Sequence, residues 1–210
     1  MSNILYDYII KDGKLVWANP NLYLRFPARQ SASDGVGCPI IDTGILITDI
    51  SFGLQVKYRA YKTPFEGMLL LGNISSYRFQ KDRISIFGKT NEFSTLLNNS
   101  ICTLKWDGPA GLATLELGDG RIETIQSVAG TNIGSSTQKL GSTWNYQTGF
   151  DYYCFKIFQN NDLIQHLVPV PAGLKIGDYT VPSNGMWDIV EQKFYGNSGT
   201  GEFTYGGGGR

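Results

Sequence analysis

The sequence predicts an all-β protein: a two-sheet antiparallel β-sandwich of jelly-roll type with a small amino-terminal β-hairpin extension. Three observations lead to this prediction. Glycine accounts for 26 of the 210 residues and charged side chains for only 17%, against averages of about 7% and about 25%. Apolar residues rarely recur with helical spacing. Short segments instead alternate apolar with polar side chains, with turn-forming residues between them.

The alternation is clearest in three segments, residues 84–87, 114–117 and 121–125. A strand with this pattern packs one face against a core and exposes the other to water. Residues 91–100 are compatible with one helical turn or with a loop. Residues 129–147 are rich in Gly, Ser, Thr and Asn, which predicts an exposed loop.

Turn chemistry predicts three β-hairpins. Asp12-Gly13, Asp119-Gly120 and Asn160-Asn161 each lie between two strand-like segments. Gly, Asn and Asp tolerate the positive φ angles that two-residue hairpin turns require. Antiparallel pairing of the flanking segments follows.

We expect three parts along the chain: a docking hairpin over residues 1–20, the β-sandwich over 21–205, and a flexible glycine tail over 206–210. An isolated hairpin is only marginally stable in water. The hairpin is therefore expected to dock on the main domain, on a sister subunit or on another protein.

Composition excludes several function classes. Eighteen basic residues balance eighteen acidic ones without a run of either sign, so neither nucleic acid nor an anionic membrane is an expected partner. No apolar segment has the length of a membrane span, and the first residues lack a secretory signal, so we expect synthesis in a cytoplasm. Cys38, Cys102 and Cys154 are too widely spaced for a metal knuckle and are odd in number. We expect reduced core cysteines and no metal or cofactor.

The end of the chain carries a distinctive motif. Residues 187–190 read Trp-Asp-Ile-Val, and residues 193–203 read Lys-Phe-Tyr-Gly-Asn-Ser-Gly-Thr-Gly-Glu-Phe. Trp187, Ile189, Phe194 and Tyr195 flank a tight connection at 191–192, which predicts a hairpin with Trp187 in the core. This motif closes the predicted domain.

Residues 38–203 resemble a family of laminin-G/concanavalin-like sandwich domains. The closing motif carries the resemblance, together with Ile-Ile-Asp-Thr-Gly-Ile at 40–45 and the segments 153–158, 160–164 and 167–169. These domains occur in tail, fibre and other virion proteins of bacteriophages and prophages from gut bacteria. The sequence departs from the family over residues 22–37 and after Pro169, which affects the strand register at the amino-terminal edge.

The resemblance implies a non-enzymatic virion structural protein: a head fibre, capsid decoration or tail-fibre subunit. It would be made in the bacterial host cytoplasm, be located in the virion and contact capsid, portal or tail proteins. A homo-oligomer is expected because fibres on such domains are often trimers. The hairpin would attach the sandwich, with docking residues Ile4, Tyr6, Tyr8, Ile10, Leu15 and Trp17. Deleting residues 1–20 should then leave a folded monomer that no longer joins the particle.

A lectin is the first alternative, because an exposed aromatic ring can stack on a sugar. Trp144 and Tyr146 follow a polar loop with i, i+2 spacing and are the candidates for gripping host-surface or mucin glycans. Core packing is the competing interpretation of both residues.

A glycoside hydrolase is the second alternative, and the sequence disfavours it because no two carboxylates lie two residues apart on one strand. The single histidine, His166, is interpreted as a hydrogen-bonded strand residue rather than a catalyst. Asp42 is expected to cap a turn by accepting backbone N–H bonds.

Overall fold

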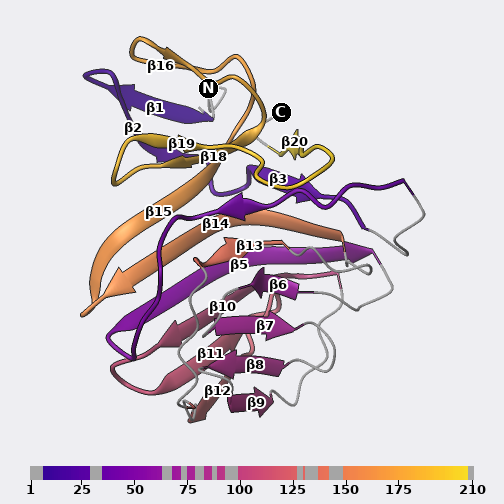
Figure 1. Cartoon of the computed structure of the whole chain (residues 1–210), viewed down its shortest axis with the longest axis vertical. Helices are drawn as coiled ribbons and strands as arrows, with labels where there is room; N and C mark the ends of the chain where they lie inside the picture. Colours follow the sequence, from indigo (N-terminus) through magenta and orange to yellow (C-terminus); the bar gives the residue numbers. More distant parts are fainter. Residues whose placement is uncertain are drawn as a thin grey trace.

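The structure is a computed structural model that describes residues 7–28, 35–62, 68–71, 75–78, 83–86, 89–92, 99–126, 130, 137–141 and 149–207 (Figure 1). Within these residues all regular secondary structure is β-strand, with no helix. Two large antiparallel sheets dominate. The predicted all-β class is confirmed, and the layering described below is consistent with a sandwich.

The larger sheet has ten strands. Eight form a continuous path, and two more, β3 (Tyr23–Phe26) and β20 (Thr204–Gly206), join through β14. The path runs β12 (Ile122–Gln126), β11 (Leu112–Glu116), β10 (Ile101–Asp107), β5 (Phe52–Lys62), β14 (Gly149–Gln159), β15 (Asp162–Val170), β18 (Gly185–Asp188) and β19 (Lys193–Tyr195). One edge of β14 is shared: its first half pairs with β3 and its second half with β15.

The smaller sheet has six strands and lies in front of the β5, β10 and β11 region in Figure 1. Its order is β4 (Ile41–Asp42), β13 (Lys139–Leu140), β6 (Met68–Leu71), β7 (Ser75–Arg78), β8 (Arg83–Ile86) and β9 (Lys89–Glu92). Ile41 and Leu140 belong to the same apolar cluster as the inner face of the larger sheet, with Leu54, Leu104 and Phe155. The two sheets therefore share a core.

A second apolar cluster lies on the opposite face of the larger sheet. There Leu15, from the hairpin of β1 (Tyr8–Lys11) and β2 (Lys14–Ala18), packs with Val168, Val170 and Trp187. Ile176, from the hairpin of β16 (Lys175–Ile176) and β17 (Tyr179–Thr180), joins them. All four residues of β18 are buried, because this end of the sheet is covered on both faces.

The three predicted hairpin turns are confirmed. Asp12-Gly13 connects β1 with β2, with φ angles of 51° and 74°. Asn160-Asn161 connects β14 with β15, with φ angles of 49° and 69°. At the third turn, between β11 and β12, Gly120 has φ 84° and its N–H donates to the Leu117 carbonyl. The left-handed backbone at each turn explains the residue types found there.

Two sequence expectations need correction. Residues 129–147 are not a loop throughout, because Lys139–Leu140 forms β13 between β4 and β6, with Leu140 fully buried. The second correction concerns the alternation expected over residues 121–125, since Ile122 is 65% exposed whereas Ile125 packs against the core. Residues three apart in a strand point to opposite faces. The possible helical turn at 91–100 falls mostly on residues 93–98, which lie outside the described residues.

The closing hairpin forms as predicted, with Trp187 opposite Phe194. The chain then runs back along the segment that precedes β4. The Asn197 side chain accepts N–H bonds from Ile40 and Gly199, at 2.9 and 2.8 Å. Thr200 exchanges a pair of 3.0 Å hydrogen bonds with the backbone of Cys38. Residues 38–40 and the closing motif, about 160 residues apart, thus meet along one line of hydrogen bonds, which we call the seam.

The seam leaves no space for a side chain at Gly199, so Gly199→Ala should destabilise the protein. A Cβ there would lie 2.1 Å from the Cys38 carbonyl oxygen. We expect the free energy of unfolding, measured by urea denaturation, to fall by about 2 kcal/mol or more. Gly173→Ala is the control, because Gly173 has a positive φ but no atom within 4 Å of the added Cβ. It should lose only about 1 kcal/mol from backbone strain. Equal losses would contradict the steric account of the seam.

Candidate functional site

The amino-terminal hairpin is held against the main domain by hydrogen bonds from Gln192 and Tyr8. Gln192, in the turn of the closing hairpin with φ 57°, accepts the Leu15 N–H and donates to the Leu15 carbonyl, both at 2.9 Å. It therefore pairs with Leu15 as a neighbouring strand would. The Tyr8 hydroxyl donates to the Pro169 carbonyl at 2.9 Å and lies 2.7 Å from the Tyr205 hydroxyl.

The structure separates the predicted docking residues into two groups. Leu15 is buried and Tyr8 is half-buried, both against the chain's own domain. Ile10 and Trp17 are each 39% exposed. Ile4 and Tyr6 lie outside the described residues.

Sequence reasoning missed two further exposed apolar residues of the hairpin. Ile9 and Val16 are each 47% exposed, and Ile9 lies directly opposite Trp17 across the β1–β2 pair. The register irregularity between Ile9 and Ile10 disturbs the strict alternation of faces. Apolar side chains that strict alternation would turn toward the core are therefore exposed.

A buried carboxylate joins three strands close to the hairpin. Asp151 of β14 is fully buried and lies between Arg25 of β3 and Arg59 of β5. Arg25 binds both carboxylate oxygens, through Nε at 2.7 Å and Nη2 at 3.0 Å. Arg59 Nε donates to Oδ2 at 3.0 Å. The Arg25 guanidinium also lies 4.2 Å from the centre of the Tyr61 ring.

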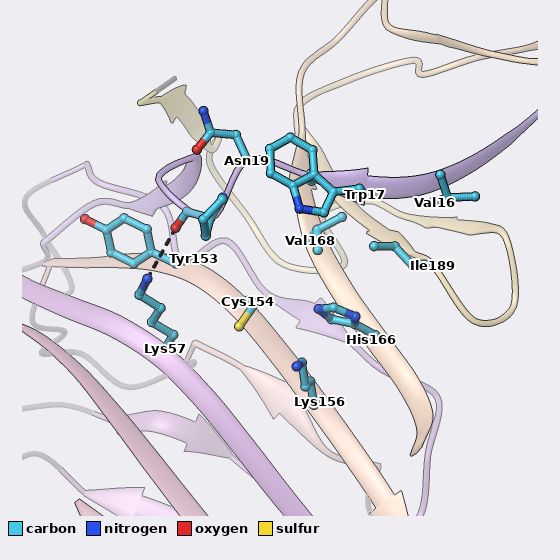
Figure 2. A pocket seen from close by; sticks show the side chains of 12 residues that line it. Val16, Trp17, Asn19, Lys57, Tyr153, Cys154, Lys156, His166, Val168 and Ile189 are labelled. Atoms are coloured by element: carbon cyan, nitrogen blue, oxygen red, sulfur yellow. Dashed lines mark hydrogen bonds between the residues drawn. The ribbon is translucent and has the colours of Figure 1, made fainter. Parts of the chain in front are cut away.

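Beside this network a pocket opens between the hairpin and the main sheet (Figure 2). Its volume is about 270 Å³. Strand β2 contributes Val16 and Trp17 to one side of the pocket. Strands β5, β14 and β15 contribute the residues on the other side, among them Val168 of β15. The aromatic, ionisable and thiol side chains that line it are Trp17, Lys57, Tyr153, Cys154, Lys156 and His166. We call this cavity the hairpin pocket.

A bulge in β14 shapes the hairpin pocket. The register with β5 shifts between Tyr152 and Cys154, so Tyr152 faces Tyr58 while Cys154 faces Lys57. The extra residue lets Tyr153 and Cys154 both line the pocket although they are consecutive. Lys57 Nζ donates to the Pro20 carbonyl at 3.4 Å and lies 5.5 Å from the centre of the Tyr153 ring.

The pocket is positively charged. Lys156 lies directly across the strand pair from His166. Burial, together with the positive charge of Lys156, lowers the pKa of His166 to about 4 from its usual 6.5, so the imidazole is neutral at pH 7. Burial raises the pKa of the Cys154 thiol, so the thiol is protonated there. None of the twelve lining residues carries a carboxylate.

Other predicted site residues have structural roles. Asp42 accepts the Gly44 N–H at 3.0 Å, as expected for a turn cap, and also receives a 2.6 Å bond from the Thr137 hydroxyl. Trp187 is 4% exposed and part of the second cluster, which confirms its core assignment. Trp144 and Tyr146, the candidates for sugar stacking, lie outside the described residues.

Cys38, Cys102 and Cys154 are free thiols, the first two buried and Cys154 in the hairpin pocket. Among the described residues, no group of three or more His, Cys, Asp or Glu side chains is arranged to hold a metal ion. The same part of the chain has no helix with the length and apolar character to cross a membrane.

In comparisons with known proteins, no family model matches the chain and no curated protein shows significant sequence similarity to it.

Replacing Gln192 with Asn should loosen the hairpin. Asn tolerates the left-handed backbone at this position, but its side chain is one methylene shorter and cannot reach both Leu15 groups. We expect hydrogen exchange of the Leu15 amide to accelerate by about tenfold or more, since the two hydrogen bonds to Leu15 contribute about 1 kcal/mol each. Amides in β10, remote from the hairpin, serve as the internal control. Unchanged exchange at Leu15 would show that Leu15 burial alone holds the hairpin.

Stability should fall as the pH is lowered from 7 to 5, in part through His166. The pKa of His166 is lower in the folded state than in the unfolded state, so the unfolded chain binds more protons between these values and acid favours unfolding. Discounted for partial solvent exposure, the loss at pH 5 is about 1 kcal/mol. Urea denaturation should show a smaller loss for His166→Asn over the same range. An identical pH dependence in both proteins would contradict a neutral buried His166.

Proposed function

We propose that the chain is a non-enzymatic structural protein of a bacteriophage or prophage particle, a head fibre, capsid decoration or tail-fibre subunit. The β-sheet body acts as a rigid support. The exposed side of the hairpin binds a neighbouring virion protein.

The first support is the similarity of residues 38–203 to virion sandwich domains. The residues that carry it are also those that organise this fold. Asp42 caps the turn after β4, and the Asn197 and Thr200 side chains bond to the backbone of residues 38–40. Motif residues that serve the fold in this way suit a scaffold.

The observation that carries the proposal is the hairpin itself. Its inner side is immobilised by Leu15, Tyr8 and the Gln192 bonds. Four of its other apolar side chains are 39–47% exposed, namely Ile9, Ile10, Val16 and Trp17, and of these Val16 and Trp17 also border the hairpin pocket. Several exposed apolar side chains on one rigid element are typical of protein-binding surfaces.

Deletion of residues 1–20 is a poor test of this role. It would remove the fully buried Leu15 from the cluster with Val168 and Trp187, and losing a buried leucine costs about 2–5 kcal/mol. Failure to join a particle would then reflect unfolding as readily as lost docking. A surface substitution separates the two effects.

Ile9→Asp is the sharper variant, because Ile9 is exposed and does not line the hairpin pocket. A charge at the centre of a desolvated contact should reduce the copies of this protein per particle several-fold or more. Quantitative mass spectrometry of purified particles of the encoding phage measures this. Ile122→Asp, at the remote strand β12, is the matched control and should leave incorporation unchanged. Absence of the unaltered chain from particles would refute the virion role, whereas normal incorporation of Ile9→Asp would refute docking through the hairpin.

A further inference from the structure

The hairpin pocket has the composition of a small-molecule site rather than of a gap between elements. Its walls are apolar, from Val16, Trp17 and Val168, and its polar groups come from β5, β14 and β15. At about 270 Å³ it is slightly smaller than the roughly 300–1,000 Å³ usual for drug-sized ligands. One ring-sized group with its substituents is therefore the fitting occupant.

The charges of the pocket select an anion. Lys57 already has a partner in the Pro20 carbonyl. Lys156 makes no hydrogen bond or ion pair with any described residue. It lies directly opposite His166 across the β14–β15 pair, and both side chains line the pocket. A partly buried cation without a counter-ion gains from binding a carboxylate.

The remaining polar groups suit hydroxyls. A neutral imidazole has one donor and one acceptor nitrogen, which matches a hydroxyl group that both donates and accepts. The Trp17 indole, 39% exposed, borders the same space and offers a flat apolar surface (Figure 2). An aromatic face packs well against the C–H face of a sugar ring, and the hydroxyls of the same ring supply the partner that the imidazole needs.

We propose that the hairpin pocket binds a pyranose ring bearing a carboxylate, such as a hexuronic acid residue, with Lys156 pairing with the carboxylate and Trp17 packing against the ring. His166 binds a ring hydroxyl. The site differs from the predicted sugar-stacking pair Trp144 and Tyr146, and it does not depend on the virion role, since a glycan site serves a free protein equally well.

The test is a titration of the full chain with methyl β-glucuronide, followed by ¹H–¹⁵N NMR at the Trp17 indole and the His166 amide. A small site with one ion pair should give a Kd of the order of 1 mM. Methyl β-glucoside carries a neutral hydroxymethyl group in place of the carboxylate, and acetate carries the carboxylate without the ring. Each should bind at least tenfold more weakly than the glucuronide.

Three variants locate the binding. Lys156→Gln should weaken glucuronide about tenfold and remove its advantage over the glucoside. Trp17→Leu should weaken both sugars and leave acetate unchanged. Lys105→Gln alters another lysine of the same sheet outside the hairpin pocket and should have no effect.

Several results would overturn the proposal: no shifts at Trp17 or His166 at millimolar glucuronide, equal affinity for glucuronide and glucoside, or equal affinity for glucuronide and acetate. Unchanged affinity in a Lys156→Gln protein with a native spectrum would also refute it. Normal particle incorporation with failed glucuronide binding would leave the proposed function standing, so the two proposals fail separately.

Discussion

The buried carboxylate of Asp151 is the constraint on which the arrangement of the larger sheet depends. A fully buried charge is tolerable only when its partners satisfy it, and losing one partner of such a network costs about 3–5 kcal/mol. Here the partners come from strands on both sides of β14, Arg25 from β3 and Arg59 from β5. The network therefore fixes β3 against β14, and the Asn19 turn before β3 in turn sets where the hairpin leaves the sheet.

The hairpin makes the outer face of the sheet functional in two ways. It buries Leu15 and extends the core to a second layer at one end, which stiffens the body. It also overhangs β14 and β15 and so encloses the hairpin pocket (Figure 2). A support and a small binding site are thus products of the same docking contact. The hairpin contributes the apolar residues Val16 and Trp17 to the pocket, whereas the charged wall comes from β5 and β14.

Local chemistry made part of this structure predictable. The Asp-Gly and Asn-Asn turns, the cap at Asp42 and the closing hairpin depend on residues a few positions apart, and the sequence indicates all of them. The Arg25, Arg59 and Asp151 network joins residues up to 126 positions apart, and no local pattern marks it. The sequence marks Trp17 as a docking residue and His166 as a strand residue, but their meeting with Lys156 in one pocket depends on the docking of the hairpin. Strand β13 escaped prediction because two residues are too few to show alternation.

The seam between residues 38–40 and 197–201 has a consequence for the order of events during synthesis. Both β3 and the Cys38 segment find their partners in the last third of the chain, in β14, β20 and the closing loop. While the ribosome is still translating the middle of the protein, these early strands have unsatisfied backbone edges. Contacts of such long range slow folding and prolong the exposure of aggregation-prone intermediates. Emergence of residues 149–206, rather than of the first half of the sequence, is therefore the step that commits this fold.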